Sequence, residues 1–185
     1  MDASLTVAEI FKNANLSPRG PVRWGTQVSE SGAGIYVVAR VGDATVGCKA
    51  CALPFIDFAN PYDNLKYPLS PLDLDLEYER KRWLPNEPVL YIGKTDRPIH
   101  KRVGEFYRHK CGDTSPHAGG QVVKLLRCDL WVYWSPEDNP YDSELTMLCA
   151  FKEQTGQVPF ANGCNGKPKR IRRSNWPTTL RPVVS

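Results

Sequence analysis

Residues 89–106 read VLYIGKTDRPIHKRVGEF, and this stretch decides the fold. Its first half, VLYI, is an apolar run of the kind that forms a buried strand, and a glycine follows it directly. Its second half begins with DRP, which is typical of a helix start, and then repeats apolar residues every three or four positions. A strand that turns within a few residues into a basic helix places Tyr91, Lys94 and Arg102 close behind one strand end.

Two more strands and two more helices are predicted around this unit. Residues 34–41, GIYVVARV, are nearly all apolar or β-branched, and residues 128–135, CDLWVYWS, alternate large apolar groups. Residues 5–14 space their apolar groups at helical intervals, and a further helix is predicted from Asn139 to Gly156. We therefore expect a small central sheet with helices packed against it.

The chain of 185 residues has the length of a single domain with one core. Residues 1–33 are predicted to form a helix and then a loop, because NLSPRGPVRWGTQ breaks the helical pattern with prolines and glycines. Prolines also recur through 43–88, so this segment is interpreted as an irregular insertion with a short helix near 73–82. The core then spans 34–162, and a basic tail occupies 163–185.

Composition and charge exclude a membrane-embedded protein. Hydrophobic residues make up 41% of the sequence, and no apolar run approaches the roughly 18 to 20 residues of a membrane helix. The N-terminus lacks the pattern of a secretory signal, so we expect a cytoplasmic protein with no membrane partner. The formal net charge is only +4. The tail is strongly basic, and its side chains are expected either to contact phosphate or to be solvated: Lys167, Lys169, Arg170, Arg172 and Arg173.

Six cysteines are spread along a chain that is too long to depend on disulfides, so reduced thiols are expected. Residues 48–51, CKAC, have the spacing of half a zinc site. A second pair is missing, because Cys111, Cys164 or His117 could complete the set only by distant folding. We therefore do not expect structural zinc.

Two charged residues are predicted to point inward from the helices. At about 100° per residue, Arg102 and Glu144 both fall within the apolar stripes of their helices. Burying either charge costs several kcal/mol unless it is paired or used. One explanation is a structural salt bridge between Arg102 and Glu144. The other is a phosphate-binding arginine beside a metal-binding carboxylate.

The tripeptides GIY at 34–36 and YIG at 91–93, followed by Arg102, Glu144 and Asn162, resemble the GIY-YIG nuclease superfamily. The stretches HAGGQVVKLL and SELTMLCAFKEQTGQVPFAN are similar to a bacterial branch of it. The resemblance covers the core segment and implies an α+β fold, with a central three-stranded, mainly antiparallel sheet flanked by helices. The family usually joins the first two strands by a short hairpin, whereas this chain has the long insertion, which is expected to read the target sequence or bind a partner.

The resemblance also implies roles for individual residues. Glu144 is similar to the family's single metal-ligating carboxylate, which suits Mg²⁺ or Mn²⁺. Arg102 would bind the scissile phosphate through its charged fork. Tyr36 and Tyr91 would orient or deprotonate the attacking water, with Lys94 and Arg102 lowering the pKa of a phenol that is ordinarily about 10.

Three further residues complete the set of expected site residues. Asn162 would support the site by hydrogen bonding. His117, in a His-x-Gly-Gly element, is expected to take part in the chemistry, and His109 is a weaker candidate because it lies seven residues after Arg102 instead of the usual four. The alternatives are an exposed loop histidine for His117 and an ordinary turn asparagine for Asn162.

The expected function is metal-dependent hydrolysis of double-stranded DNA by an endonuclease, sequence-specific and used in a restriction or defence setting. Symmetric cutting would require two active sites, and hence a homodimer or sequential nicking. The alternatives are a catalytically silent nucleic-acid-binding module on the same fold and a protein-interaction domain that uses the proline-rich insertion. An inward carboxylate beside phosphate disfavours the silent module, because like charges repel.

Overall fold

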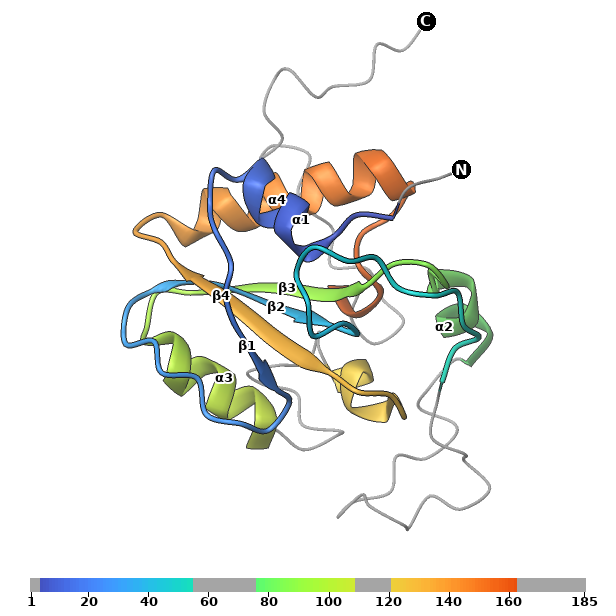
Figure 1. Cartoon of the computed structure of the whole chain (residues 1–185), viewed down its shortest axis with the longest axis horizontal. Coiled ribbons are helices and arrows are strands. Elements are labelled where there is room, and N and C mark those ends of the chain that lie inside the picture. Colours follow the sequence, from blue (N-terminus) through green and yellow to red (C-terminus); the bar gives the residue numbers. More distant parts are fainter. Residues whose placement is uncertain (1–3, 55–75, 109–120, 163–185) are drawn as a thin grey trace, which may run out of the picture.

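The computed structural model describes residues 4–54, 76–108 and 121–162 and has the element order shown in Figure 1. The helices are α1 (Val7–Asn13), α2 (Leu76–Arg82), α3 (Ile99–Arg108) and α4 (Pro140–Thr155), with 3-10 turns η2 (Gln121–Leu125) and η3 (Phe160–Asn162). The strands are β1 (Arg19–Arg23), β2 (Gly34–Ala39), β3 (Val89–Thr95) and β4 (Trp131–Pro136). None of the described helices has the length and hydrophobicity to span a membrane.

The four strands form one antiparallel sheet in the order β1-β4-β2-β3, so the chain has an α+β fold. β2 and β4 are the inner strands, whereas β1 and β3 are the two edges. The expected strands near 34–41, 89–93 and 128–135 are all present in this sheet.

The predicted count of three strands is wrong because β1 lies in the segment that we expected to be a loop. β1 pairs with β4 and contains Pro21, with an irregular register between Arg19 and Val22. Proline is tolerated on an edge strand because one side of that strand needs no backbone donor. Gly20 also has a packing role, since a Cβ there would come within 2.6 Å of the Trp134 ring.

Strand β2 divides the core into two layers because all six of its residues are buried. Ile35 and Val37 point into the apolar cluster that includes α1 and α4, and Tyr36 and Val38 point into the cluster that includes α3. Figure 1 accordingly shows α1 and α4 on one face of the sheet and α3 on the other. Period-two alternation along a fully buried strand produces this division.

The helices begin and end where the local sequence favours it. Thr6 and Glu9 form a reciprocal capping box at the start of α1. α4 has Pro140 in its first turn and ends at Gly156, whose φ of 81° is readily adopted by glycine. The predicted helices at 5–14, near 73–82 and from Asn139 to Gly156 are confirmed.

The described parts of the insertion pack against the rest of the domain. The indole nitrogen of Trp83 donates to the Cys51 carbonyl at 2.8 Å, and the Arg127 amide donates to the Pro54 carbonyl at 2.6 Å. Trp83 is 7% exposed and belongs to the same apolar cluster as Tyr36. These parts of the insertion therefore share the core of the sheet.

Candidate functional site

The pairing of β2 with β3 brings the two tyrosines together. Tyr36 lies opposite Gly93, and Val38 lies opposite Tyr91, so both tyrosines occupy the α3 face as diagonal neighbours. Their ring centroids are 5.9 Å apart. The two tyrosines of the GIY and YIG tripeptides are therefore neighbours on one face of the sheet.

Gly93 and Phe106 determine how the tyrosine rings lie. A Cβ on Gly93 would come within 2.6 Å of both rings and 2.8 Å of the Tyr36 hydroxyl oxygen, so the absent side chain leaves room for that hydroxyl. Phe106 of α3 packs against both rings, with centroid distances of 6.4 Å to Tyr36 and 5.4 Å to Tyr91. Phe106 and the two rings thus form an apolar wall around the phenols.

This wall changes the acid–base behaviour of the tyrosines. Burial raises the pKa of Tyr36 and raises the pKa of Tyr91 well above its ordinary value, although the nearby Arg102 guanidinium opposes both shifts. The buried Tyr36 hydroxyl has no hydrogen-bond partner of regular geometry among the described residues. Arg102 thus lowers the pKa of both phenols as expected, but the expected net decrease does not occur because desolvation outweighs the cation.

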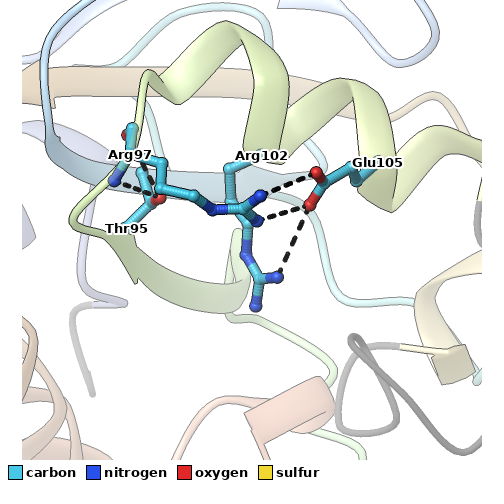
Figure 2. A network of polar contacts seen from close by, with 4 residues as sticks. All are labelled: Thr95, Arg97, Arg102 and Glu105. Atoms are coloured by element: carbon cyan, nitrogen blue, oxygen red, sulfur yellow. Dashed lines mark hydrogen bonds and ion pairs between the residues drawn. The ribbon is translucent and has the colours of Figure 1, made fainter.

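Arg102 extends from α3 and is held only loosely by its own helix. Its Nη1 atom lies 3.8 Å from Oε2 of Glu105, three residues later. Figure 2 shows that the same carboxylate accepts two shorter bonds from Arg97, at 3.0 and 2.7 Å. Thr95 helps to fix the backbone at Arg97, since its hydroxyl oxygen accepts a hydrogen bond from the Arg97 amide at 3.0 Å. Arg97 therefore occupies the carboxylate that would otherwise neutralise Arg102.

Glu144 approaches from α4, which packs on the opposite face of the sheet from α3 (Figure 1). Burial raises its pKa from 4.5 to about 7, and the charges of Lys94 and Arg102 oppose this shift. Within the described part of the chain, no hydrogen bond or ion pair holds its carboxylate. The alternative of an Arg102–Glu144 salt bridge is not observed, although the two charges still influence each other.

Lys94 lies on β3 opposite Ile35 and therefore on the α4 side of the sheet. Its ammonium group is 3.9 Å from the centre of the Tyr141 ring, in a cation–π arrangement. Its charge acts on Glu144 and is not among the groups that influence either site tyrosine. The charges of Lys94, on the α4 side of the sheet, and of Arg102, on α3, thus both act on Glu144.

Asn162 fixes the outer side of that edge strand. Its side-chain oxygen accepts from the Ile92 amide at 2.9 Å, and its side-chain nitrogen donates to the Ile92 carbonyl at 2.6 Å. Ile92 is the middle residue of the YIG tripeptide. Asn162 therefore replaces the neighbouring strand that an edge strand lacks.

The remaining predicted site residues lie outside the described part of the chain. They are His109, His117, Lys167, Lys169, Arg170, Arg172 and Arg173. Phe106, Glu105 and Arg97 were not expected at the site. The spacing of Glu105 three residues after Arg102 on a helix was an available sign. Nothing in the sequence indicated that Arg97 would share the carboxylate.

The described residues contain no group of three histidine, cysteine, aspartate or glutamate side chains that could enclose a metal ion. Glu144 is a single hard oxygen ligand whose burial is uncompensated, as its raised pKa shows. Such a carboxylate fits Mg²⁺ or Mn²⁺ where waters and substrate complete the coordination. The donors present do not form a self-sufficient metal cage.

Comparisons with protein-family models, curated proteins and solved structures find no match to this chain. Any statement about its chemistry therefore depends on the geometry of the site. The site combines a permanent cation in Arg102, two neutral phenols and one buried carboxylate at a sheet edge. This set can bind an anion and orient a water molecule beside it.

We expect Asn162→Ala to lower the free energy of unfolding by about 1 to 3 kcal/mol, because the buried Ile92 peptide groups lose both partners. Asn162→Asp should also destabilise, since its second carboxylate oxygen would face the Ile92 carbonyl. Urea unfolding measures both effects, and Asn13→Ala, at the exposed end of α1, is the control. Equal stability of Asn162→Ala and the wild type would show that the two bonds contribute nothing.

We expect the stability gained by Glu144→Gln to depend on pH. Between pH 4.5 and about 7 the folded protein retains a proton that the unfolded chain has released, so the stability contributed by Glu144 falls as pH rises through this range. The Gln variant should therefore be more stable than the wild type at pH 8 by about 1 to 2 kcal/mol, allowing for solvent screening.

This difference should vanish at pH 4, where the wild-type carboxyl is protonated in both states. Urea unfolding at the two pH values measures it. The matched control is Glu153→Gln, an exposed carboxylate on the same helix, which should change stability little at either pH. A Gln variant less stable than the wild type at pH 8 would contradict the inferred cost of the buried charge.

Proposed function

We propose that this protein is a metal-dependent endonuclease of the GIY-YIG type that hydrolyses DNA phosphodiester bonds. The observation that supports the proposal is that Tyr36 and Tyr91 are neighbours on one face of the sheet and that the charges of Arg102 and Glu144 both act on these two phenols. These four residues come from two strands and two helices on opposite faces of the sheet. A structural salt bridge would account for two of them but not for the phenols.

Arg102 supplies the group that binds the scissile phosphate. Its guanidinium is always charged and presents a planar fork that matches two phosphate oxygens. The 3.8 Å contact with Glu105 leaves most of this hydrogen-bonding capacity for a ligand. In the partly buried setting beside Phe106, charge on the phosphate is stabilised more strongly than in water.

The tyrosines position the attacking water as neutral phenols. Their raised pKa values keep both protonated at physiological pH, so a phenol oxygen can accept a hydrogen bond from water while its own proton is donated elsewhere. The Tyr36 hydroxyl has Tyr91 and Arg102 as polar neighbours but makes no hydrogen bond of regular geometry with the described residues, so it is the better candidate for this contact. Gly93 preserves the room that this hydroxyl needs.

Glu144 is the residue that would hold the magnesium or manganese ion. When bound, such an ion would offset the negative charge that develops on the phosphate. The charges of Lys94 and Arg102 help to keep the carboxylate ionised. A silent nucleic-acid-binding module has no use for this group, since a buried carboxylate beside phosphate weakens anion binding.

The wider biological setting rests on the sequence. The basic tail is proposed to contact the phosphates of double-stranded DNA, and the insertion is proposed to contribute to target choice. Sequence-specific double-strand cleavage in a restriction or defence system, by a homodimer, is the setting that we favour.

The central test compares the wild type with Glu144→Ala on supercoiled plasmid and on a defined linear duplex, with magnesium, manganese or a chelator. We expect discrete fragments only with metal, and a loss of cleavage of about 100-fold or more in the variant. Glu153→Ala, on an exposed position of the same helix, should cleave as the wild type does.

Two results would contradict the enzyme. Equal cleavage by Glu144→Ala and the wild type would remove Glu144 from the site. No cleavage with any metal, together with tight DNA binding by both proteins, would leave the alternative of a silent binding module.

A second test concerns the Arg97–Glu105 pair. In Arg97→Ala the Glu105 carboxylate loses two bonds and can pair fully with Arg102, so affinity for duplex DNA should fall by about fivefold. The double variant Arg97→Ala/Glu105→Gln should recover most of this affinity. Fluorescence anisotropy with a labelled duplex in chelator measures binding without cleavage.

The control is Arg19→Ala, which removes the same charge from an ion pair between Arg19, on the opposite edge strand β1, and Glu30. If the double variant binds as weakly as Arg97→Ala, Arg97 contacts DNA directly and the competition between Glu105 and phosphate for Arg102 is excluded.

A further inference from the structure

A second cluster of reactive groups lies at the C-terminal end of β2. Arg40 follows the strand directly, and its fork reaches two sulfur atoms. Its Nη1 atom donates to Sγ of Cys51 and its Nη2 atom donates to Sγ of Cys48, both at 2.6 Å. One guanidinium therefore bridges both cysteines of the CKAC sequence.

The guanidinium is fixed by contacts that do not involve sulfur. Arg40 also donates to the Pro85 carbonyl at 2.7 Å and to the Glu87 carbonyl at 2.8 and 3.2 Å. Its carbon Cζ lies 4.8 Å from the centre of the Trp83 ring, over which it stacks. The positive charge is therefore held in place independently of the protonation state of the thiols.

The two thiols differ in exposure in the way that disulfide exchange requires. Cys51 is exposed and accessible to a small reagent, whereas Cys48 is half-buried and donates to the Asn86 carbonyl at 3.0 Å. Burial raises the pKa of Cys48, and the Arg40 charge opposes that shift. An exposed attacking thiol backed by a resolving thiol three residues away is the arrangement of a redox pair.

A metal ion fits this cluster poorly. Arg40 already places a cation against both sulfurs, and it would repel a second one. The described residues provide no group of three ligands that could enclose a metal. A third thiol, Cys128, lies within electrostatic reach of Cys48, Cys51 and Arg40, but it is a competing partner in thiol chemistry and not a third metal ligand.

We propose that Cys48 and Cys51 form a thiol–disulfide exchange site in which the Arg40 fork holds both sulfur atoms. The inference does not depend on nuclease activity. Cys51 thiolate attacks one sulfur of a low-molecular-weight disulfide, forming a mixed disulfide and releasing one thiolate of the reagent. Cys48 thiolate then attacks Cys51 Sγ, which forms the Cys48–Cys51 bond and releases the second thiolate. The disulfide reagent is reduced by two electrons as the protein dithiol is oxidised.

Arg40 shifts the equilibrium between the Cys48–Cys51 dithiol and its disulfide towards the dithiol. Charge-assisted bonds to both sulfurs stabilise the reduced pair, because disulfide sulfurs carry no charge and accept hydrogen bonds weakly. Removing the fork should therefore favour the disulfide. Oxidation in turn weakens the contacts between Arg40 and residues 48–51, which join the insertion to the sheet.

The test equilibrates the full chain in buffers of reduced and oxidised glutathione, traps free thiols by alkylation and maps disulfides by mass spectrometry. We expect an intramolecular Cys48–Cys51 bond in the wild type and in Cys128→Ser, and its absence in Cys51→Ser. In Arg40→Lys the disulfide should form more readily, so that half of the protein is oxidised at a ratio of oxidised to reduced glutathione roughly tenfold lower than in the wild type.

Several outcomes would overturn the proposal. One is a Cys51–Cys128 bond as the main disulfide, and another is equal formation of mixed disulfides on Cys51 and on the unrelated Cys149. The proposal would also fail if the midpoint of oxidation were unchanged in Arg40→Lys, or if a stoichiometric metal ion protected Cys48 and Cys51 from alkylation. If circular dichroism shows that Arg40→Lys is unfolded, the bond in Cys128→Ser and its loss in Cys51→Ser decide the matter.

Discussion

The pairing of the edge strand β3 is the interaction on which the candidate site depends. On its inner side β3 pairs with the buried strand β2, which sets Tyr36 opposite Gly93. On its outer side, both peptide groups of Ile92 are bonded to Asn162. Because β3 is an edge, side chains from both faces of the sheet can meet along it. The charges of Arg102, on α3, and of Glu144, on α4, influence each other at this strand without forming an ion pair.

Burial at this edge has two opposed effects. Phe106 and the tyrosine rings exclude water, which strengthens any interaction between Arg102 and an anion. Burial also raises the pKa of Glu144 to about 7, so the ionised carboxylate destabilises the folded state. A structural role would have been served by a neutral residue at this position. A half-buried carboxylate with a raised pKa is a feature that occurs often at functional sites, and it is the reason that Glu144 enters the proposal.

The sequence predicted regular elements well and contacts between side chains poorly. β2, β3 and α4 follow from apolar periodicity, and the inward positions of Arg102 and Glu144 follow from the angular spacing of a helix. β1 was missed because Gly20 and Pro21 have loop propensities that the edge position of the strand overrides. The phenol pKa values were misjudged because cations are visible in a sequence, whereas desolvation by Phe106 is not. The shared Glu105 carboxylate and the Arg40 fork depend on rotamers, which no spacing rule specifies.

The two clusters are connected through the apolar core. Arg40 stacks on Trp83, and Trp83 packs edge-on against Phe160 at 5.2 Å between ring centroids. Phe160 begins the short turn that ends at Asn162, the residue bonded to Ile92 of β3. The contacts of the insertion thus continue, through well-packed aromatic rings, to the strand that positions Tyr91. A long insertion in a surface loop costs little closure entropy, but this one contributes core residues as well. It is therefore part of the structure that holds the site together, and its place between the two tyrosine-bearing strands does not separate them.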